Sequence, residues 1–552
     1  MRILSRSFIL FIVLFYTQIA SAAFRQPLRG KRAMVVSAHP LASDVGLKIL
    51  QKGGNAIDAA VATTFAISVV EPFSAGIGGG GFLLLRNSRH RKIKALDFRE
   101  RAPLKATKNM YLEDNGKVRT RASINGYLAV ATPGTVAGMY EVHRRYGKLP
   151  WKTVVEPSVK LAKDGFVVSN RFVNAVKRRK KMIASNQAAR AIFTRSGNYY
   201  QPGEKLVQKD LGRTLQDIAS NPQNFYTGRI ARAIVDDMAK NGGLITLEDL
   251  KSYKPIWRDP VCGNFRQARV CSMPPPSSGG IHLLQMLNII GDTAFKSLGW
   301  HPPAKLRRQQ IDMQRAKPST QVKPVSKQTL QKFSQTKPSK LLLATSNPKS
   351  KIQNPKSKES TETSHLTVID EQLNAVSLTF TINLGFGAGV VTPGTGIVLN
   401  NEMDDFAAAP GVPNAFGLVG NEANSIAPLK TPLSSMTPTI VTENGRLRMA
   451  LGTPGGSTII TQVLQIILNV LEYDMDAAAA VSAPRIHHQW LPDALRVEPL
   501  GLDTLTLQEL KRRGHKIRQT NPWGNSNLII VKPDGTLEGA ADSRGEGKAR
   551  GI

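Results

Sequence analysis

Residues 363–382, TSHLTVIDEQLNAVSLTFTI, decide how this chain folds. The β-branched segments 365–369 and 375–382 predict two strands, and residues 370–374 between them predict a hairpin turn. The preceding residues, 302–362, are rich in Lys, Ser, Gln and Pro, a composition that cannot bury enough apolar surface to become ordered. Thr363 therefore stands where a predicted flexible linker meets the first strand of a sheet, although on spacing alone it could be an ordinary strand threonine.

Helix and strand patterns alternate through the rest of the 552 residues, of which 41% are hydrophobic. Residues 42–70 predict two helices joined by a turn at Gly53-Gly54-Asn55. A second hairpin is predicted around Asn444-Gly445. The other predicted strands are 82–85 and 95–98, and the other predicted helices are 136–146, 151–163, 231–241, 278–290 and 457–471. This mixed pattern predicts a large unit built from both helices and sheets.

The first 22 residues predict a secretory signal peptide. A basic start precedes a short apolar run, and Ala20-Ser21-Ala22 provides a small-x-small cleavage site. The run is shorter than the roughly 20 apolar residues of a membrane span, and no later segment is long and apolar enough to form one. We therefore expect a mature protein that begins at Ala23, is periplasmic or secreted, and has no membrane span.

The formal net charge of +34 by itself suggests nucleic acid or an anionic surface as a partner. Its distribution weakens that interpretation. Between His301 and Ser360 there are fourteen Lys or Arg residues against Asp312 and Glu359, without periodicity, and the remaining charge is scattered. The charges lack the interleaved aromatic pattern of nucleic-acid-binding surfaces, so we predict no specific nucleic-acid partner.

The two cysteines, Cys262 and Cys271, flank a segment that predicts a short hairpin. In an exported protein they could form a cross-strand disulfide or remain as two buried thiols, and the sequence does not decide between these. Their spacing does not fit a zinc site, and no Walker loop, His-Glu-x-x-His or Gly-x-Ser-x-Gly motif is present. We therefore predict neither a metal nor a cofactor.

Seven segments together resemble the γ-glutamyltranspeptidases, a family of N-terminal-nucleophile hydrolases. They occur in the order of that family and span nearly the whole mature chain outside the linker: 97–100, 132–138, 273–280, 363–365, 399–406, 432–436 and 454–457. The resemblance implies an α+β fold, a four-layer αββα sandwich formed jointly by two subunits cut from one precursor. Cleavage between Glu362 and Thr363 would give a large subunit, 23–362, and a small catalytic subunit, 363–552.

By this resemblance Thr363 is the nucleophile. A threonine hydroxyl is weakly nucleophilic at neutral pH, and the α-amino group freed by cleavage, with an ordinary pKa near ~8, supplies a base on the same residue. Thr381 matches the residue that hydrogen-bonds the nucleophile and assists processing; otherwise it is a cross-strand threonine. The N–H groups of Gly455 and Gly456 match the oxyanion hole; otherwise they form a plain turn.

A γ-glutamyl donor carries an α-carboxylate and an α-ammonium, so its pocket needs both signs of charge at a fixed separation. The residues that match the carboxylate clamp of the family are Arg99, Ser434 and Ser435, and those that match its ammonium site are Asn383, Glu402 and Asp405. The His487-His488 pair resembles a family motif with no ligand role.

The chain departs from the family in two places. A helical stretch after residues 281–290 is largely missing, since the chain passes from 298–300 almost directly to 311–319, and this loss could expose apolar surface. In the lid-like segment 410–428, Phe416 stands where bacterial relatives often have a tyrosine. Phenylalanine can cover a pocket but cannot donate the hydrogen bond that closes the lid.

The sequence therefore predicts an autoprocessing γ-glutamyltransferase and glutathione hydrolase. Its donors would be glutathione or other γ-glutamyl compounds, and its acceptors amino acids, dipeptides or water. One alternative is a cephalosporin-type acylase of the same fold, which retention of both Glu402 and Asp405 disfavours because its donors lack the α-ammonium. The other is an unprocessed, inactive remnant that binds polyanions.

Overall fold

The computed structural model describes residues 26–291 and 362–552, with the exception of residue 410. Two predicted segments lie outside the described residues: the signal peptide and the linker up to residue 361. So does the segment 298–319, in which the helical stretch of the family is largely missing. Within the described ranges, every helix is too short or too polar to cross a membrane.

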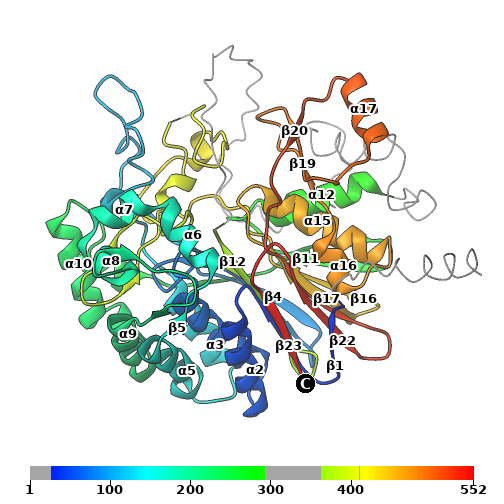
Figure 1. The fold of residues 1–552 in the computed structure, drawn as a ribbon, viewed down its shortest axis with the longest axis horizontal. Coiled ribbons are helices and arrows are strands. Elements are labelled where there is room, and N and C mark those ends of the chain that lie inside the picture. Colours follow the sequence, from blue (N-terminus) through cyan, green and yellow to red (C-terminus); the bar gives the residue numbers. More distant parts are fainter. Residues whose placement is uncertain (1–25, 292–361, 410) are drawn as a thin grey trace, which may run out of the picture.

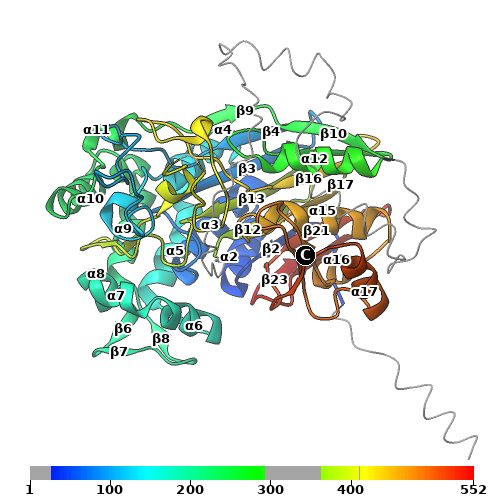
Figure 2. The same ribbon diagram turned by 90° about the horizontal axis from the view of Figure 1, so that it is seen from above.

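Two seven-stranded antiparallel sheets are stacked face to face, and helices cover the outer face of each (Figures 1 and 2). In spatial order, the first sheet consists of β23 (Lys548–Gly551), β2 (Met34–Ser37), β12 (Ser364–Ile369), β13 (Ala375–Thr381), β3 (Gly80–Asn87), β4 (Lys92–Asp97) and β9 (Ile256–Arg258). The second consists of β1 (Leu28–Gly30), β22 (Leu537–Ala541), β21 (Asn527–Val531), β17 (Arg446–Gly452), β16 (Thr439–Glu443), β11 (Ala268–Ser272) and β10 (Val261–Phe265).

The helices fall into two groups around these sheets. Beside the first sheet lie α2 (Pro40–Gln51), α3 (Ala56–Val70), α4 (Thr135–Tyr146), α5 (Trp151–Asp164), α6 (Asn170–Arg178), α7 (Lys180–Ser185), α8 (Gln187–Phe193), α9 (Lys209–Ser220), α10 (Arg229–Lys240) and α11 (Leu247–Ser252). Beside the second lie α12 (Gly279–Ile290), α15 (Thr458–Leu471), α16 (Ala477–Ser482) and α17 (Thr504–Arg512). The predicted α+β sandwich is confirmed, and each predicted helix and strand is present within a few residues of its expected bounds.

Strand β3 shows how the layers are held together. Because successive side chains of a strand point to opposite faces, Phe82 and Leu84 enter the core between the sheets, while Leu83 and Leu85 pack toward the helices of the first sheet. Among those helices α3 is buried along its whole length, and a capping box formed by Asn55 and Asp58 fixes its start. Both faces of β3 are therefore apolar, whereas β12 and β13 carry buried polar side chains on the face toward the second sheet, among them His365, which contacts the hydroxyls of Thr367 and Thr379.

The hairpin of β12 and β13 lies in the middle of the first sheet. One edge of β12 pairs with β2 and the other with β13, and β13 pairs in turn with β3. Both sheets contain strands from before and after the bond between residues 362 and 363. The sequence predicted the hairpin from local signals, but its central position depends on pairings between residues some 290 positions apart.

The remaining elements are short. They comprise β5 (Phe166–Val167) with β8 (Lys205–Leu206), β6 (Thr194–Arg195) with β7 (Asn198–Tyr199), β14 (Val391–Thr392) with β15 (Ile397–Val398), and a three-stranded sheet of β18 (Ile486–His487), β19 (Leu495–Val497) and β20 (Ile517–Gln519). The 3₁₀ turns are η1 (Tyr127–Ala129), η2 (Pro222–Phe225), η4 (Glu402–Asp405) and η5 (Glu422–Asn424).

Cys262 and Cys271 form a disulfide between directly paired positions of β10 and β11, so the structure supports the first of the two alternatives left open by the sequence.

The bridge closes a short loop and restricts the unfolded chain. We expect Cys262→Ser with Cys271→Ser to lower the free energy of unfolding by about 2.5 kcal/mol, measured by guanidinium denaturation. Reductant should destabilise the parent and leave the double variant unchanged; a parent indifferent to reductant would contradict the prediction.

Candidate active site

Thr363 immediately precedes β12, and its hydroxyl lies against that of Thr381, the last residue of β13. The two Oγ1 atoms are 3.1 Å apart and both side chains are buried. The N–H of Asn383 donates to Thr381 Oγ1 at 2.8 Å, and the carbonyl oxygen of Glu362 lies 3.5 Å from the same atom. Because Thr381 accepts from Asn383, its own proton can point toward Thr363 or toward the Glu362 carbonyl.

Side chains on both sides of the peptide bond between Glu362 and Thr363 are held by fixed partners. The Glu362 carboxylate accepts from Arg178 at 2.7 Å and from the Ser74 hydroxyl at 3.3 Å. On the other side, Ser364 Oγ donates to the buried carboxyl of Glu71 at 3.1 Å. Burial raises the pKa of Glu71. Sequence reasoning missed Arg178 and Glu71, because nothing local to either residue connects it to Thr363.

Arg99, just after β4, lies at the centre of a buried charged cluster. Its guanidinium forms ion pairs with Glu402 and with Asp405, the latter at 2.5 Å, and donates to the carbonyl of Leu433 at 3.1 Å. The side chain is 1% exposed. Burial raises the pKa of both acids, and the positive charge of Arg99 opposes that shift. Arg99, predicted for the carboxylate clamp, and Glu402 and Asp405, predicted for the ammonium site, therefore lie in one cluster. Within it the arginine is paired with the two acids.

Glu100 is a further member of this cluster that sequence reasoning missed. Its Oε2 lies 3.9 Å from the Arg99 guanidinium, and the residue is completely buried. Burial raises the pKa of Glu100 to about 7, although Arg99 acts in the opposite direction. Three carboxyl groups thus surround one guanidinium. The available signal was an acid directly after Arg99 in the segment Asp97-Phe98-Arg99-Glu100.

The raised pKa of Glu100 predicts a pH dependence of stability. In the unfolded chain this carboxyl ionises near ~4.3, so between that pH and about 7 the folded state binds more protons than the unfolded state. The free energy of unfolding therefore falls as the pH rises through this window. Between pH 5 and pH 8 we expect the free energy of unfolding to fall by about 1 kcal/mol or more less in Glu100→Gln than in the parent. Urea denaturation at the two pH values measures this difference. An unchanged loss would contradict this, and Glu113→Gln, on an exposed loop, is the matched control.

The Ser434-Ser435 turn lies beside Arg99 because Leu433, whose carbonyl accepts from Arg99, directly precedes it. The segment before α12 supports the turn: Ser278 N–H donates to the Ser434 carbonyl at 2.9 Å, and Ser434 N–H donates to the Pro276 carbonyl at 3.0 Å. Asn383, in the left-handed conformation with φ 73°, donates through Nδ2 to the Asn401 carbonyl at 3.0 Å. The structure therefore brings every residue of the predicted donor pocket to one region.

Gly455 and Gly456 form a tight turn between β17 and α15. Their φ angles of 136° and 55° favour glycine. A Cβ on Gly456 would lie 2.6 Å from the ring of Phe416, so this ring of the lid-like segment packs directly over the turn. Within the described chain neither glycine N–H has a hydrogen-bond partner. Two unpaired N–H groups near the start of a long helix are suited to an oxyanion.

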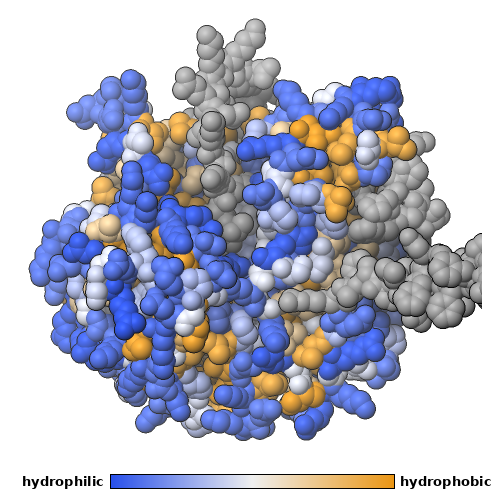
Figure 3. Space-filling view, viewed as in Figure 1, coloured by the Kyte–Doolittle hydropathy of each residue, from blue (hydrophilic) through white to orange (hydrophobic). Residues whose placement is uncertain are grey.

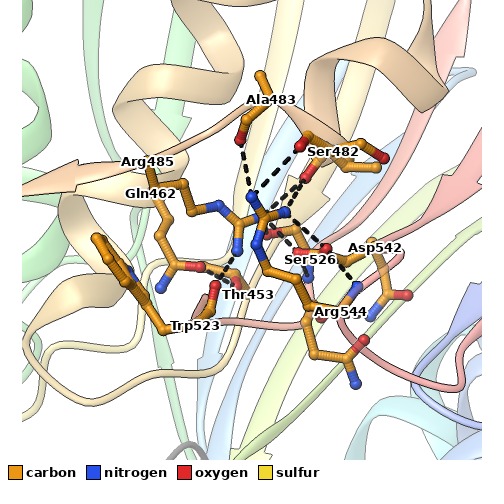
Figure 4. Close-up of polar contacts among 12 residues, drawn as sticks. Thr453, Gln462, Ser482, Ala483, Arg485, Trp523, Ser526, Asp542 and Arg544 are labelled. Carbon is orange, nitrogen blue, oxygen red and sulfur yellow. Dashed lines mark hydrogen bonds and ion pairs between the residues drawn. The ribbon is translucent and has the colours of Figure 1, made fainter. Parts of the chain in front are cut away.

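A buried polar network braces this turn (Figure 4). Gln462 of α15 donates to the carbonyl of Pro454 at 3.1 Å and accepts from the Thr453 hydroxyl at 3.0 Å. Next to them Arg485 and Arg544 converge on Asp542, to which Arg544 donates at 2.9 Å. Removing one partner of such a buried pair leaves an uncompensated charge. Gln462 therefore ties the two residues before the glycine pair to α15.

The His487-His488 pair has polar partners of its own. His487 contacts the Thr461 hydroxyl at 2.9 Å and Gln489 Oε1 at 2.9 Å, and His488 contacts Asp493 at 3.1 Å. In residues 26–291 and 362–552 no three side chains of the metal-ligating types gather as a metal site would require. These contacts link the pair to α15 and agree with a structural role.

The profile of the family described as Gamma-glutamyltranspeptidase matches residues 42–552. The chain belongs to this family. The glutathione hydrolase proenzyme of Escherichia coli strain K12 is 43% identical, over 94% of this chain and 91% of its own length. The Acylase ACY 1 proenzyme of Pseudomonas sp. strain V22 is 38% identical over 95% and 94%. The crystal structure of a cephalosporin acylase from Bacillus halodurans superposes with a TM-score of 0.79, at 26% identity, over 97% and 98% of the two chains.

These relatives confirm the predicted γ-glutamyltranspeptidase family and its fold. They include proteins named as glutathione hydrolases and proteins named as acylases. The glutathione hydrolase of Escherichia coli is the more similar of the two relatives, at 43% against 38% identity, which supports the predicted glutathione hydrolase over the acylase. Two of the relatives are named as proenzymes, which agrees with a precursor that is cut.

Proposed function

We propose that this chain is an autoprocessing γ-glutamyltransferase and glutathione hydrolase in which Thr363 carries the acyl group. The observation on which this rests is the buried cluster of one guanidinium and three carboxyl groups beside a pair of hydrogen-bonded threonines. Glu100 of the cluster packs against Gly80, which is the strand partner of Thr381. The relatives named as glutathione hydrolases support it. The proposed large and small subunits are residues 23–362 and 363–552, from a precursor exported to the periplasm or beyond.

In the proposed processing step, Thr363 Oγ1 attacks the carbonyl carbon of Glu362. The peptide C–N bond breaks, an ester to Oγ1 forms, and the amide nitrogen becomes the free α-amino group of Thr363. Water then hydrolyses the ester and leaves a carboxylate on Glu362. Thr381, within reach of both the attacking hydroxyl and the carbonyl, would donate to one of them.

In the proposed catalytic step, the α-amino group of Thr363 takes the hydroxyl proton as Oγ1 attacks the γ-carbonyl of the donor. The negative charge that develops on the carbonyl oxygen would be stabilised by the N–H groups of Gly455 and Gly456. The leaving amine receives the proton, and water or the amine of an amino acid or dipeptide then attacks the γ-glutamyl ester. Transfer to an amine gives a new γ-glutamyl amide, and transfer to water gives glutamate.

The charge of the cluster favours a γ-glutamyl donor over the acyl groups of cephalosporin-type acylases. The α-carboxylate of the donor would bind Arg99 and the hydroxyls of Ser434 and Ser435, and its α-ammonium would bind Glu402 and Asp405 with Asn383. An acyl group without the α-ammonium would leave buried carboxylates uncompensated. Retention of all these groups also argues against an inactive remnant.

The test uses the purified chain and three anilides. Mass spectrometry is expected to find a smaller fragment that begins at Thr363. The γ-glutamyl anilide should be hydrolysed with a kcat/KM at least about 100-fold above that of the glutaryl anilide, which differs by the missing α-amino group alone, and the α-glutamyl isomer should react poorly. A faster glutaryl anilide would favour the acylase, and an intact chain would favour the remnant.

A further inference from the structure

A cavity of about 950 Å³ lies beside the candidate active site, between helices α6 to α8, the loop before η1, the end of α10 and the loop that leads into β14. Helices α6, α7 and α8 form a group on one side of the sandwich (Figures 1 and 2), and hydrophilic residues gather over α7 and α8 (Figure 3). One lining residue, Asp237, is acidic. The basic lining residues are Arg121, Lys177, Arg178, Arg179, Lys180 and Lys181.

Most of these basic side chains form no ion pair within the part of the chain that the structure describes. Among the described residues, Arg178 alone of the six forms an ion pair, with Glu362. Arg179 donates to the backbone carbonyls of Gly385 at 2.8 Å and Gly387 at 3.4 Å, which engages two of its N–H groups without neutralising its charge. Such a cluster of like charges favours the binding of an anion.

The acid of the cavity does not neutralise these cations. Asp237 is buried and accepts hydrogen bonds from the Tyr127 hydroxyl at 3.1 Å and from Asn241 Nδ2 at 3.0 Å. On the basic side, burial and the neighbouring charge of Arg121 lower the pKa of Arg179 to about 10, with Glu362 acting in the opposite direction. The arginines therefore lie close enough to repel one another.

The cavity shares its wall with the site at Thr363. Arg178 holds the side chain of Glu362, the residue attached to Thr363, and Arg179 holds the loop 385–387 that follows Asn383. A molecule bound among the basic side chains would thus contact the two arginines that hold Glu362 and the loop 385–387. It would lie close to Thr363. The volume is that of a small-molecule pocket, roughly 300–1,000 Å³, and is suited to a short peptide.

We propose that this cavity is the acceptor site of the enzyme and that it selects peptides carrying adjacent carboxylates. The proposal rests on the proposed transferase function. The arginine forks would bind the planar carboxylates in a bidentate manner, and the lysines would add charge. The free α-amino group of the acceptor then attacks the γ-glutamyl ester: an amide bond forms, the ester bond to Thr363 Oγ1 breaks, and the proton of the amine returns to that oxygen.

Binding is tested first on the uncut chain, Thr363→Ala, by calorimetric titration with Glu-Glu and with its neutral counterpart Gln-Gln. We expect Glu-Glu to bind at least tenfold more tightly, and Lys180→Glu with Lys181→Glu to remove at least tenfold of that affinity. The control, Lys152→Glu with Lys160→Glu, makes the same change of net charge on exposed positions of α5 and should bind Glu-Glu like the parent. Equal affinities for the two dipeptides, or equal losses in both double variants, would overturn the proposal.

Kinetics on the cleaved enzyme provide the second measurement, with γ-glutamyl anilide as donor. The ratio of the KM for Glu-Glu to that for Gln-Gln should rise about tenfold in the Lys180/Lys181 variant and stay constant in the Lys152/Lys160 variant. Inorganic phosphate that displaced Glu-Glu at equal concentration would reveal a general anion site and overturn the selectivity. If the anilide is not hydrolysed at all, the proposed function fails. The titration of the uncut chain still tests whether the cavity binds Glu-Glu more tightly than Gln-Gln.

Discussion

Replacing Thr363 with alanine is expected to leave the chain in one piece and to lower kcat/KM for the γ-glutamyl anilide by at least about 10⁴-fold. The same hydroxyl is proposed to attack Glu362 during processing and the donor during catalysis, so its loss removes both reactions. Mass spectrometry reads the first effect and anilide hydrolysis the second. The neighbouring hydroxyl of Thr381, 3.1 Å away, does not replace it, because no α-amino group is freed on that residue.

Two further variants separate the roles of this residue. Thr363→Ser keeps a hydroxyl and should be cut, with reduced activity. Thr381→Val removes the hydroxyl that lies between Thr363 and the Glu362 carbonyl, and should slow cleavage while leaving the cut position unchanged. Cleavage of the Thr363→Ala chain before residue 363 would show that the nucleophile is a different residue.

Replacing Arg99 with lysine should lower kcat/KM for the γ-glutamyl anilide by about 10²–10³-fold, chiefly through a higher KM. Lysine keeps the charge but loses the planar fork that reaches two partners at once. Arg99→Met should have a larger effect and also lower the free energy of unfolding by about 3–5 kcal/mol, because it leaves Glu402 and Asp405 buried without a counter-charge.

Separate measurement of KM, kcat and thermal unfolding keeps the two consequences of an Arg99 substitution apart. Arg101→Lys is the matched control, since this arginine is two residues away and stacks on the ring of Tyr253. It should change kcat/KM by less than threefold. A kcat/KM for Arg99→Lys within threefold of the parent would show that Arg99 does not bind the donor.

Much of the fold could be predicted because its signals are local. The β12–β13 hairpin is encoded by two β-branched runs and the turn between them, and the break between α2 and α3 by Gly53-Gly54-Asn55. The order of strands in each sheet is set by packing between distant segments, and no local pattern reveals that β13 lies between β12 and β3.

The candidate site also contains residues that the sequence predicted and residues that it did not. Arg99, Glu402 and the glycine pair were assigned through resemblance to a family; the structure then paired Arg99 with Glu402 and placed the glycines in the turn between β17 and α15. Glu100 was missed although it is adjacent to Arg99, because an acid beside an arginine usually faces solvent, and its burial depends on the packing around Gly80. Arg178 was missed because its partner, Glu362, is 184 residues away.

The position of β12 and β13 between β2 and β3 has a consequence for the lifetime of the enzyme. Before the proposed cleavage one chain carries all the information needed to fold; afterwards that information is divided between two chains, each of which contributes strands to both sheets. Refolding of the mature protein then requires the two pieces to meet again, so it becomes bimolecular and dependent on concentration. Once cut, such an enzyme persists because it unfolds slowly rather than because it refolds readily.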